Sequence, residues 1–439
     1  MTTLTARPRA WFDLGRHDVR SNVPALIRAM LQNGILDRVF LDALKPEFIF
    51  PAIADSEPWT SGMGDTKTFT RKGLLAPATT AITGSDTSAA TYGIEQWSVT
   101  MDQYGQAVDT NMLYSAMALQ SKYIADVQTL GINAGQSINQ IARNKLYAAY
   151  AGGRTWCRTA ATTDTSMQVQ STNGFTHVLV NGVPTPVSAS NPLTVSIEGV
   201  ANTVTGVDTS TRTLTLGTTR VDVQGDYVVA ANAPFSVRGG TGNDSAFDLG
   251  TGDKATFALF RAAVTRLRKM NVPTLGGYYV AHIDPDTESQ LFDDSEFKAA
   301  LQGRVDSPIY TDLSIGRFGG IDWVRNNECP TVASGTDGTS VEVHRPIVLG
   351  GGALIAAPFE NMGNMLGGTG VEDVPDITMV SPVPGVDVAL IVRPPTDRLQ
   401  QTLSTSWSWV GDYGVPSDSL ANNDAALFKR GVVIEHSAS

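Results

Sequence analysis

The chain has 439 residues, of which 42% are hydrophobic and 17% are charged, and its formal net charge at pH 7 is -11. This length predicts about two or three domains with buried cores. The negative charge argues against an autonomous DNA-binding protein, and no run reaches the roughly 20 apolar residues of a membrane span. Cys157 and Cys329 are too few for a disulfide framework, so we expect free thiols and folding in a cytoplasm.

Residues 1–55 predict an arm that contains one helix. Asn22 is a candidate N-cap, Pro24 falls near the first helical position, and an apolar stripe follows. The stripe consists of Leu26, Met30, Leu31 and Ile35. The segment is slightly basic, unlike the chain as a whole, and it is interpreted either as an arm that reaches a neighbouring copy or as a solvated leading helix.

Residues 56–109 predict a long two-stranded hairpin. Apolar and long side chains alternate with small polar ones in both strands, which is typical of strands with one buried face. The alternating positions are Lys67, Phe69 and Arg71 in the first strand and Trp97, Val99 and Met101 in the second. Residues 73–91, between them, are rich in Ala, Thr, Ser and Gly and cannot build a core. Because an isolated hairpin is marginal in water, we expect this one to lie on another copy of the chain.

A helix of unusual length is predicted over residues 110–150, roughly 60 Å at 1.5 Å per residue. Its apolar positions are spaced by threes and fours. They are Leu113, Ala116, Met117, Tyr123, Ile124, Val127, Ala134, Ile138, Ile141 and Leu146. Gly131 and Gly135 each cost about 1 kcal/mol relative to Ala. They allow either a bend or a close approach of the helix to a sheet, and the Gly152–Gly153 pair ends the helix.

The composition changes after this helix. Residues 154–240 are dominated by Thr, Val, Ser, Asn and Gly in short alternating runs. The predicted strands are residues 175–180, 193–197, 212–216 and 227–230. Asn181, followed by a glycine, is a strong candidate for a two-residue hairpin turn. Many short strands without a helical period predict an inserted all-β domain, a small barrel or sandwich, over residues 154–245.

Residues 246–439 predict an α/β domain followed by returning strands. Residues 255–270 have the pattern of an amphipathic helix, and the basic residues of its last turn suit the helix dipole better than an anion site. The predicted strands are residues 278–283, 321–324, 347–349, 386–392, 399–409 and 427–434.

Candidate chemical groups each have a structural explanation. His282, Asp284, Asp286 and Glu288 could be taken for a metal cluster, but Asp284 precedes a proline as N-caps often do, and acidic residues favour the first turn of a helix. Residues 350–352 are glycines after a strand, but the lysine and Ser/Thr of a phosphate loop are missing, so a tight turn or close packing is expected. No zinc-binding or nucleophile-elbow spacing is present. We therefore predict no enzyme, no cofactor and no metal site.

Two motifs carry a family resemblance. Residues 282–286 read His-Ile-Asp-Pro-Asp and precede Leu-Phe-Asp-Asp-Ser-Glu-Phe at 291–297, and residues 315–324 read Ile-Gly-Arg-Phe-Gly-Gly-Ile-Asp-Trp-Val. With this order of parts, the chain resembles the major capsid protein of tailed double-stranded DNA bacteriophages, in a subfamily with an inserted β-domain. The resemblance implies an α+β, Hong Kong 97-type fold. Its parts would be an N-arm (1–55), an E-loop hairpin (56–109), the spine helix of the peripheral domain (110–153), the inserted all-β domain (154–245), and an axial domain with returning peripheral strands (246–439).

The resemblance also implies a function. The chain would be a structural subunit that self-assembles into pentamers and hexamers of an icosahedral shell and encloses phage DNA without sequence-specific binding. Its partners would be other copies, a separate scaffolding protein, the portal and, in some relatives, a decoration protein. It would be assembled in the bacterial cytoplasm and found in the virion. Because the arm-like sequence starts close to Met1, we expect no cleaved scaffolding region. The alternatives are an encapsulin-like compartment shell and, from another class, a β-rich surface adhesin.

Six hairpin residues are candidates for contacts between subunits. They are Trp59, Lys67, Phe69, Arg71, Lys72 and Trp97. Trp59 and Phe69 would be anchors, and Arg71 and Lys72 would pair with acidic residues of a neighbour or else remain solvated. Some members of the family cross-link subunits through a hairpin lysine, but no matching partner is evident for Lys67 or Lys72.

Overall fold

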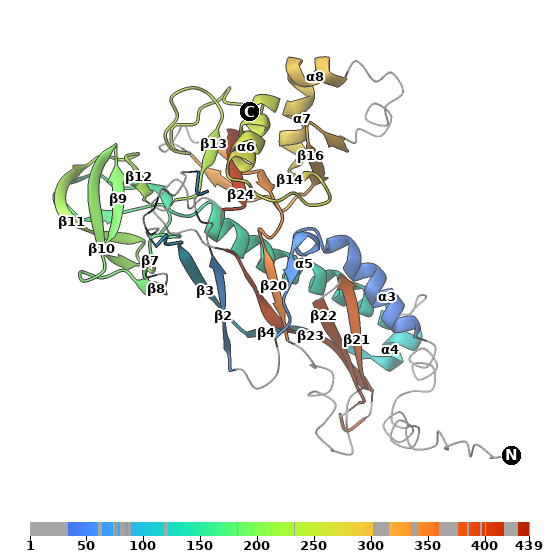
Figure 1. The fold of residues 1–439 in the computed structure, drawn as a ribbon. Helices are drawn as coiled ribbons and strands as arrows, with labels where there is room; N and C mark the ends of the chain where they lie inside the picture. Colours follow the sequence, from blue (N-terminus) through green and yellow to red (C-terminus); the bar gives the residue numbers. More distant parts are fainter. Residues whose placement is uncertain are drawn as a thin grey trace. The chain divides into compact units, whose positions relative to one another are not determined.

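The computed structural model describes residues 34–439 apart from 60–63, 73–74, 76, 80–83, 85, 87–88, 118–121, 182, 232, 302–315, 335–340, 360–375, 384–385, 396, 400, 417–428 and 439. These residues form a mixed α/β structure in which strands outnumber helices (Figure 1), which confirms the predicted class at that level. No helix among the described residues combines the length and the apolar content that a membrane crossing requires.

The chain divides into two compact units. The first takes the chain up to Lys67, Val99–Ala142 and Ala356–Tyr413, and the second takes Thr68–Ser98, Arg143–Ile355 and Gly414–Ser439. Each unit is assembled from stretches that are far apart in sequence. The contacts that hold each unit together are therefore mostly non-local, and composition along the chain cannot reveal them.

A six-stranded sheet forms the centre of the first unit. Its order is β1 (Asp55–Ser56), β20 (Ile355–Pro358), β23 (Thr402–Gly414), β22 (Val386–Arg393) and β21 (Asp376–Val383), and β4 (Asp102–Asn111) also pairs with β23. Trp409 of β23 is fully buried and stacks against Tyr104 and Tyr413, with ring centroids 5.8 Å and 5.6 Å away. Large buried aromatic side chains of this kind dominate the energetics of a core.

Helices pack against this sheet. The helix α3 (Ile35–Leu44) buries Leu36, Phe40 and Leu44 and contacts β21. Two short 3-10 turns follow it, η2 (Lys45–Glu47) and η3 (Pro51–Ile53). On α5 (Lys122–Tyr150), Asn133 accepts a hydrogen bond of 3.1 Å from Nε1 of Trp407 in β23. The predicted cap of the arm helix, Asn22 and Pro24, lies outside the described residues.

The long helix starts later than predicted. Residues up to Asn111 form β4, which pairs with β23 over ten residues, and a short helix α4 (Met112–Met117) comes before α5. At 29 residues, α5 is about 44 Å long rather than 60 Å. The predicted apolar position Leu113 is accordingly 53% exposed, whereas Val127 and Ile138 are fully buried. The predicted apolar periodicity holds in α5, and strand pairing with β23 took only Thr110 and Asn111 from the predicted range.

The two glycines of α5 allow a close approach to another helix rather than to a sheet. A Cβ atom on Gly131 would lie 2.8 Å from the carbonyl oxygen of Phe40 in α3. A Cβ on Gly135 would lie 2.9 Å from the carbonyl oxygen of Leu44. One turn further along, Asn139 accepts a hydrogen bond of 2.9 Å from the backbone N–H of Phe50. The end of α3 and the turns after it are thus held directly on the α5 backbone.

In the second unit, a curved six-stranded sheet is built from residues 154–230 alone (Figure 1). Its order is β5 (Arg154–Trp156), β12 (Tyr227–Ala230), β9 (Leu193–Ile197), β10 (Val200–Asp208), β11 (Thr213–Asp222) and β6 (Ala161–Gln168). It encloses an apolar cluster that includes Met167, Phe175 and Ile197. Beside it, β7 (His177–Val180) and β8 (Val183–Pro186) form the predicted hairpin, with Asn181 at the left-handed φ of 52° that such turns require.

An eight-stranded mixed sheet forms the rest of the second unit. Its order is β15 (Arg317–Phe318), β16 (Ile321–Arg325), β14 (Tyr279–Ile283), β19 (Ile347–Leu349), β24 (Gly431–Ser437), β18 (Glu342–His344) and β17 (Thr331–Ala333), with β13 (Ser236–Arg238) on β24. Three helices accompany it: α6 (Phe257–Lys269), α7 (Pro285–Asp293) and α8 (Ser295–Leu301). Phe260 of α6 packs on Trp323 of β16 with ring centroids 4.8 Å apart.

Two smaller predictions are confirmed in this unit. Gly350 permits close packing, because a Cβ there would lie 2.3 Å from Val272 Cγ1 and 2.9 Å from the carbonyl oxygen of Pro273. Cys157 and Cys329 are both buried and free of disulfide bonds. Burial raises the pKa of the Cys157 thiol to about 11 and that of Cys329 to about 12, so both thiols stay protonated at neutral pH.

Candidate interaction surfaces

The predicted hairpin exists as a two-stranded sheet of β2 (Thr66–Lys72) and β3 (Ile94–Thr100). On one face Phe69 stacks on Trp97 with ring centroids 5.7 Å apart, and the Arg71 guanidinium lies 5.5 Å from the Trp97 ring. On the other face Gln96 donates a hydrogen bond of 3.3 Å to Thr70. The hairpin therefore has an aromatic face and a polar face, as its alternation predicts.

The aromatic candidates are buried within the chain itself. Trp59 is 1% exposed, Phe69 6% and Trp97 5%. The backbone N–H of Trp59 donates to the carbonyl oxygen of Pro358 at 2.8 Å, so this buried tryptophan is held on a strand of the first unit. Side chains buried so completely within one chain have little surface left for another copy, and the contact of Trp59 and Phe69 with a neighbour stays a prediction.

The charged candidates are at least partly exposed to solvent. Lys72 is exposed, and Arg71 is half-buried. Lys67 donates to the carbonyl oxygen of Pro58 at 3.2 Å and lies 3.9 Å from the carboxylate of Glu57. An ion pair this long and this exposed contributes little to stability. The tip of the hairpin, residues 73–91, falls largely outside the described residues.

A buried polar cluster lies where β14 meets α7. Asp284 occupies the N-cap position of α7, as predicted, but its side chain does not cap the helix. Instead its carboxylate pairs with Nδ1 of His344 and accepts a hydrogen bond from Thr287. The other ring nitrogen of His344 faces Asp286 at 3.7 Å, and the His436 ring stacks on His344 with centroids 5.6 Å apart.

Of the four residues considered for a metal site, only Asp284 and Asp286 come together. His282 is fully buried on β14, and burial lowers its pKa to about 3, so it is neutral at physiological pH. Glu288 instead binds Arg325 through contacts as short as 2.7 Å. The group with metal-ligating atoms is Asp284, Asp286 and His344, and its two carboxylates face opposite nitrogens of one ring. A protonated imidazole satisfies both carboxylates, so an ion pair is the arrangement that this geometry favours.

Sequence reasoning missed His344 and His436 as members of this cluster. They lie on β18 and β24, which are far apart in the chain but are paired with each other in register, His344 opposite His436. In the sequence, the only indication that these histidines would be buried was that both fall in short apolar stretches. Such a signal does not say which strands will be neighbours.

Replacing His344 with Gln should lower stability most in mildly acidic solution. The hydrogen bond with Asp284 raises the pKa of His344, although its burial opposes the shift. Burial would raise the pKa of Asp284, but its bonds to His344 and Thr287 outweigh that effect and lower it. The pair therefore contributes most between about pH 4 and pH 6.5; its contribution fades as the pH rises through the raised His344 value, and also as the pH falls through the lowered Asp284 value.

We expect the loss in free energy of unfolding to be about 1.5 kcal/mol at pH 5–6 and to shrink towards pH 9. Urea unfolding of both proteins across this pH range measures it. Burial lowers the pKa of the neighbouring His436, and the charge of His344 lowers it further, so the variant also relieves a repulsion on His436 that reduces the measured loss in acid. A difference that grows as the pH rises would contradict the assignment.

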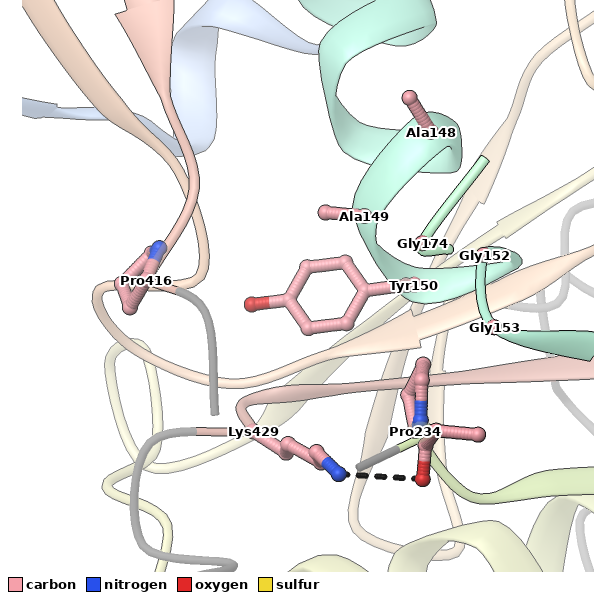
Figure 2. A pocket seen from close by; sticks show the side chains of 10 residues that line it. Ala148, Ala149, Tyr150, Gly152, Gly153, Gly174, Pro234, Pro416 and Lys429 are labelled. Carbon is pink, nitrogen blue, oxygen red and sulfur yellow. Dashed lines mark hydrogen bonds between the residues drawn. The ribbon is translucent and has the colours of Figure 1, made fainter. Parts of the chain in front are cut away.

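A small apolar hollow of about 130 Å³ lies at the end of α5 (Figure 2). Ala148, Ala149 and Tyr150 come from the helix, and Pro234 lies across from them. Lys429 also borders the hollow, but its ammonium group donates a hydrogen bond of 3.0 Å to the carbonyl oxygen of Ala233. The hollow is large enough for one small apolar side chain, and its lining offers no set of groups for chemistry.

A larger cleft of about 660 Å³ also borders Ala148. Four arginines line it, contributed by α5, by β5, by the segment between β10 and β11, and by the segment after β18. They are Arg143, Arg154, Arg212 and Arg345. Among the described residues that line this arginine cleft there is no aspartate or glutamate, and most of the others are uncharged and polar. Sequence reasoning missed the cleft, because its arginines are spread over some two hundred positions.

The chain was compared with known proteins. Its sequence matches no family model and no curated protein. Three solved structures with which the fold aligns are the capsid of Ralstonia phage GP4, the capsid of cyanophage P-SCSP1u and the capsid asymmetric unit of cyanophage Pam1. The identities are 14%, 12% and 13%, and the TM-scores are 0.48, 0.46 and 0.49. The alignments cover 89%, 89% and 90% of this chain and 89%, 89% and 92% of the other chains. All three of these solved structures are phage capsids.

Proposed function

We propose that this chain is a major capsid subunit whose role is structural, without catalysis. The observation that carries the proposal is the separate hairpin of β2 and β3, to which no other described strand is joined. Two strands alone are marginally stable in water, and a neighbouring subunit would cover the polar face of this hairpin, where Thr66, Thr68 and Thr70 are exposed. The order of elements and the two motifs of the α/β region support the same assignment.

The proposal assigns a part to each element. The β2–β3 hairpin is the E-loop, α5 is the spine helix, the sheet built from residues 154–230 is the inserted β-domain, and the eight-stranded sheet belongs to the axial domain. Arg71 and Lys72 are the hairpin residues that would pair with acidic groups of a neighbour. The inserted domain would lie on the outer surface or brace neighbouring subunits.

Assembly would follow from repetition of modest contacts. Heterologous interfaces that close into rings would produce pentamers and hexamers, and overlapping arms would add the same weak contacts many times. The net charge of -11 would keep the shell wall from adhering to enclosed double-stranded DNA. A separate scaffolding protein, a portal and in some cases a decoration protein would complete the virion.

Electron microscopy of the purified chain, expressed alone and with a candidate scaffolding protein, tests the proposal. We expect closed, regular shells in at least one of the two preparations. A chain that stays a single folded molecule in both would contradict the assignment. The contents of the particles separate the alternatives: DNA in particles from infected cells indicates a phage capsid, whereas a packaged enzyme indicates an encapsulin-like compartment.

A further inference from the structure

Two arginines that line the cleft, Arg154 and Arg345, act on one buried carboxylate together with a third arginine from outside the lining. Glu435 of β24 is 5% exposed and accepts contacts from Arg238 at 2.8 Å and Arg345 at 2.9 Å. The guanidinium of Arg154 lies near enough to act on the same carboxylate electrostatically. Three guanidinium groups thus share one buried carboxylate.

This excess is unfavourable for the chain alone. Burial, followed by repulsion from Arg238, lowers the pKa of Arg154 to about 10, which leaves Arg154 charged at pH 7. Its Nε donates a hydrogen bond of 3.0 Å to the carbonyl oxygen of Pro234, a neutral acceptor. Charges held away from water without enough opposite charge destabilise a protein, and an anion placed in the cleft would offset that effect.

The rim of the cleft adds groups suited to an anion. Arg143 of α5 faces Glu328 at 3.4 Å, a loose pair, and Arg212 is exposed. Uncharged donors lie between the arginines, among them Asn173 and Thr209, both exposed. Guanidinium groups bind carboxylates through two parallel hydrogen bonds, so several of them in one cleft recognise a run of acidic side chains.

We propose that the arginine cleft binds an acidic segment of a second copy of this chain, and this inference rests on the proposed function. The chain has 43 acidic and 32 basic residues, so other copies present an excess of carboxylates. The cleft is concave and of the size that an extended segment or a small ligand fills. A long DNA duplex is the poorer fit, because it requires a protruding element to enter its grooves.

Binding of a fluorescently labelled octaglutamate peptide to the dispersed full-length chain tests the chemistry of the cleft. Fluorescence anisotropy at low ionic strength should show saturable binding that salt weakens. The double variant Arg143→Gln and Arg212→Gln removes two rim charges and should weaken binding by about tenfold. The matched control, Arg158→Gln with Arg261→Gln, removes two exposed charges outside the cleft and should stay within about twofold of the unchanged protein.

Three results of this assay would overturn the inference. One is the absence of octaglutamate binding, and another is an equal loss of binding in both double variants. The third is tighter binding of duplex DNA than of octaglutamate with the same dependence on Arg143 and Arg212. Circular dichroism and thermal unfolding of each variant establish that it is folded.

Measuring self-association then tests whether the segment that binds in the cleft comes from a second copy of the chain. Light scattering should show that the Arg143→Gln and Arg212→Gln variant assembles more slowly than the control variant, to an extent that shrinks as salt is added. Equal assembly of both variants overturns the inference and leaves the proposed function intact. If the unchanged chain never self-associates, the second copy is excluded as the occupant and the proposed function fails too, whereas octaglutamate binding would still report the chemistry of the cleft.

Discussion

Removal of residues 73–91 from the hairpin is expected to leave a folded subunit that no longer forms stable shells. The contacts of the hairpin place Phe69 opposite Trp97 and Thr70 opposite Gln96, so Lys72 falls opposite Ile94. The deletion leaves two residues between these ends. With Tyr92→Asn they become Asn-Gly, the sequence that best closes a two-residue hairpin. Strands β2 and β3 then remain, and only the long segment that connects them is lost.

The measurement combines electron microscopy with thermal unfolding. The full-length chain with Tyr92→Asn alone is the control, and it should assemble normally. Because the deleted segment has too few apolar groups to form a core, we expect the midpoint of unfolding to change by less than about 2 °C, which corresponds to less than about 1 kcal/mol in units of this size. Shells of normal size and yield from the deletion variant would show that the hairpin does not join subunits.

Replacing Gly131 with Leu is expected to destabilise the first unit by about 3 kcal/mol, at the upper end of the usual effect of overpacking. A Cβ there would already lie 2.8 Å from the carbonyl oxygen of Phe40 and 3.0 Å from the Cβ of Ala43, so α3 would have to move. Leucine is a better helix former than glycine by roughly 0.8 kcal/mol. The helix itself would therefore gain, and the loss can come only from packing.

Ala125→Leu is the matched control, because Ala125 is exposed on the same helix. It should change the free energy of unfolding by less than about 0.5 kcal/mol. Urea unfolding, monitored by the tryptophans of the first unit, measures both variants. Equal stability of Gly131→Leu and the unchanged protein would mean that α3 does not pack on α5 as closely as described.

Much of the local structure was predictable because hydrophobic periodicity reports which face of an element is buried. The strands β9, β12 and β19 have the predicted bounds, and α6 lies within two residues of its predicted range. Asn181 marks its hairpin turn as expected, since few residues other than glycine tolerate a left-handed backbone. These features depend on neighbours in the sequence, which a single chain displays.

The start of the long helix was not predictable in the same way. Thr110 and Asn111, the first two residues of the predicted helix, are instead the last two of β4, where pairing with β23 extends the strand. The partner strand lies some three hundred residues further along the chain. Helix or strand propensity amounts to only tenths of a kcal/mol per residue, so pairing with a distant strand outweighs it.

The candidate surfaces depended even more on tertiary structure. The pattern of the chain was sufficient to establish a mixed α/β protein, a hairpin with one aromatic face and a helix interrupted by two glycines. Folding alone decided that Trp59 is part of a core, that Gly131 meets a helix rather than a sheet, and that His344 joins Asp284. It also brought four distant arginines into one cleft. Burial and charge pairing are properties of residues adjacent in space, and no single sequence states which distant residues those will be.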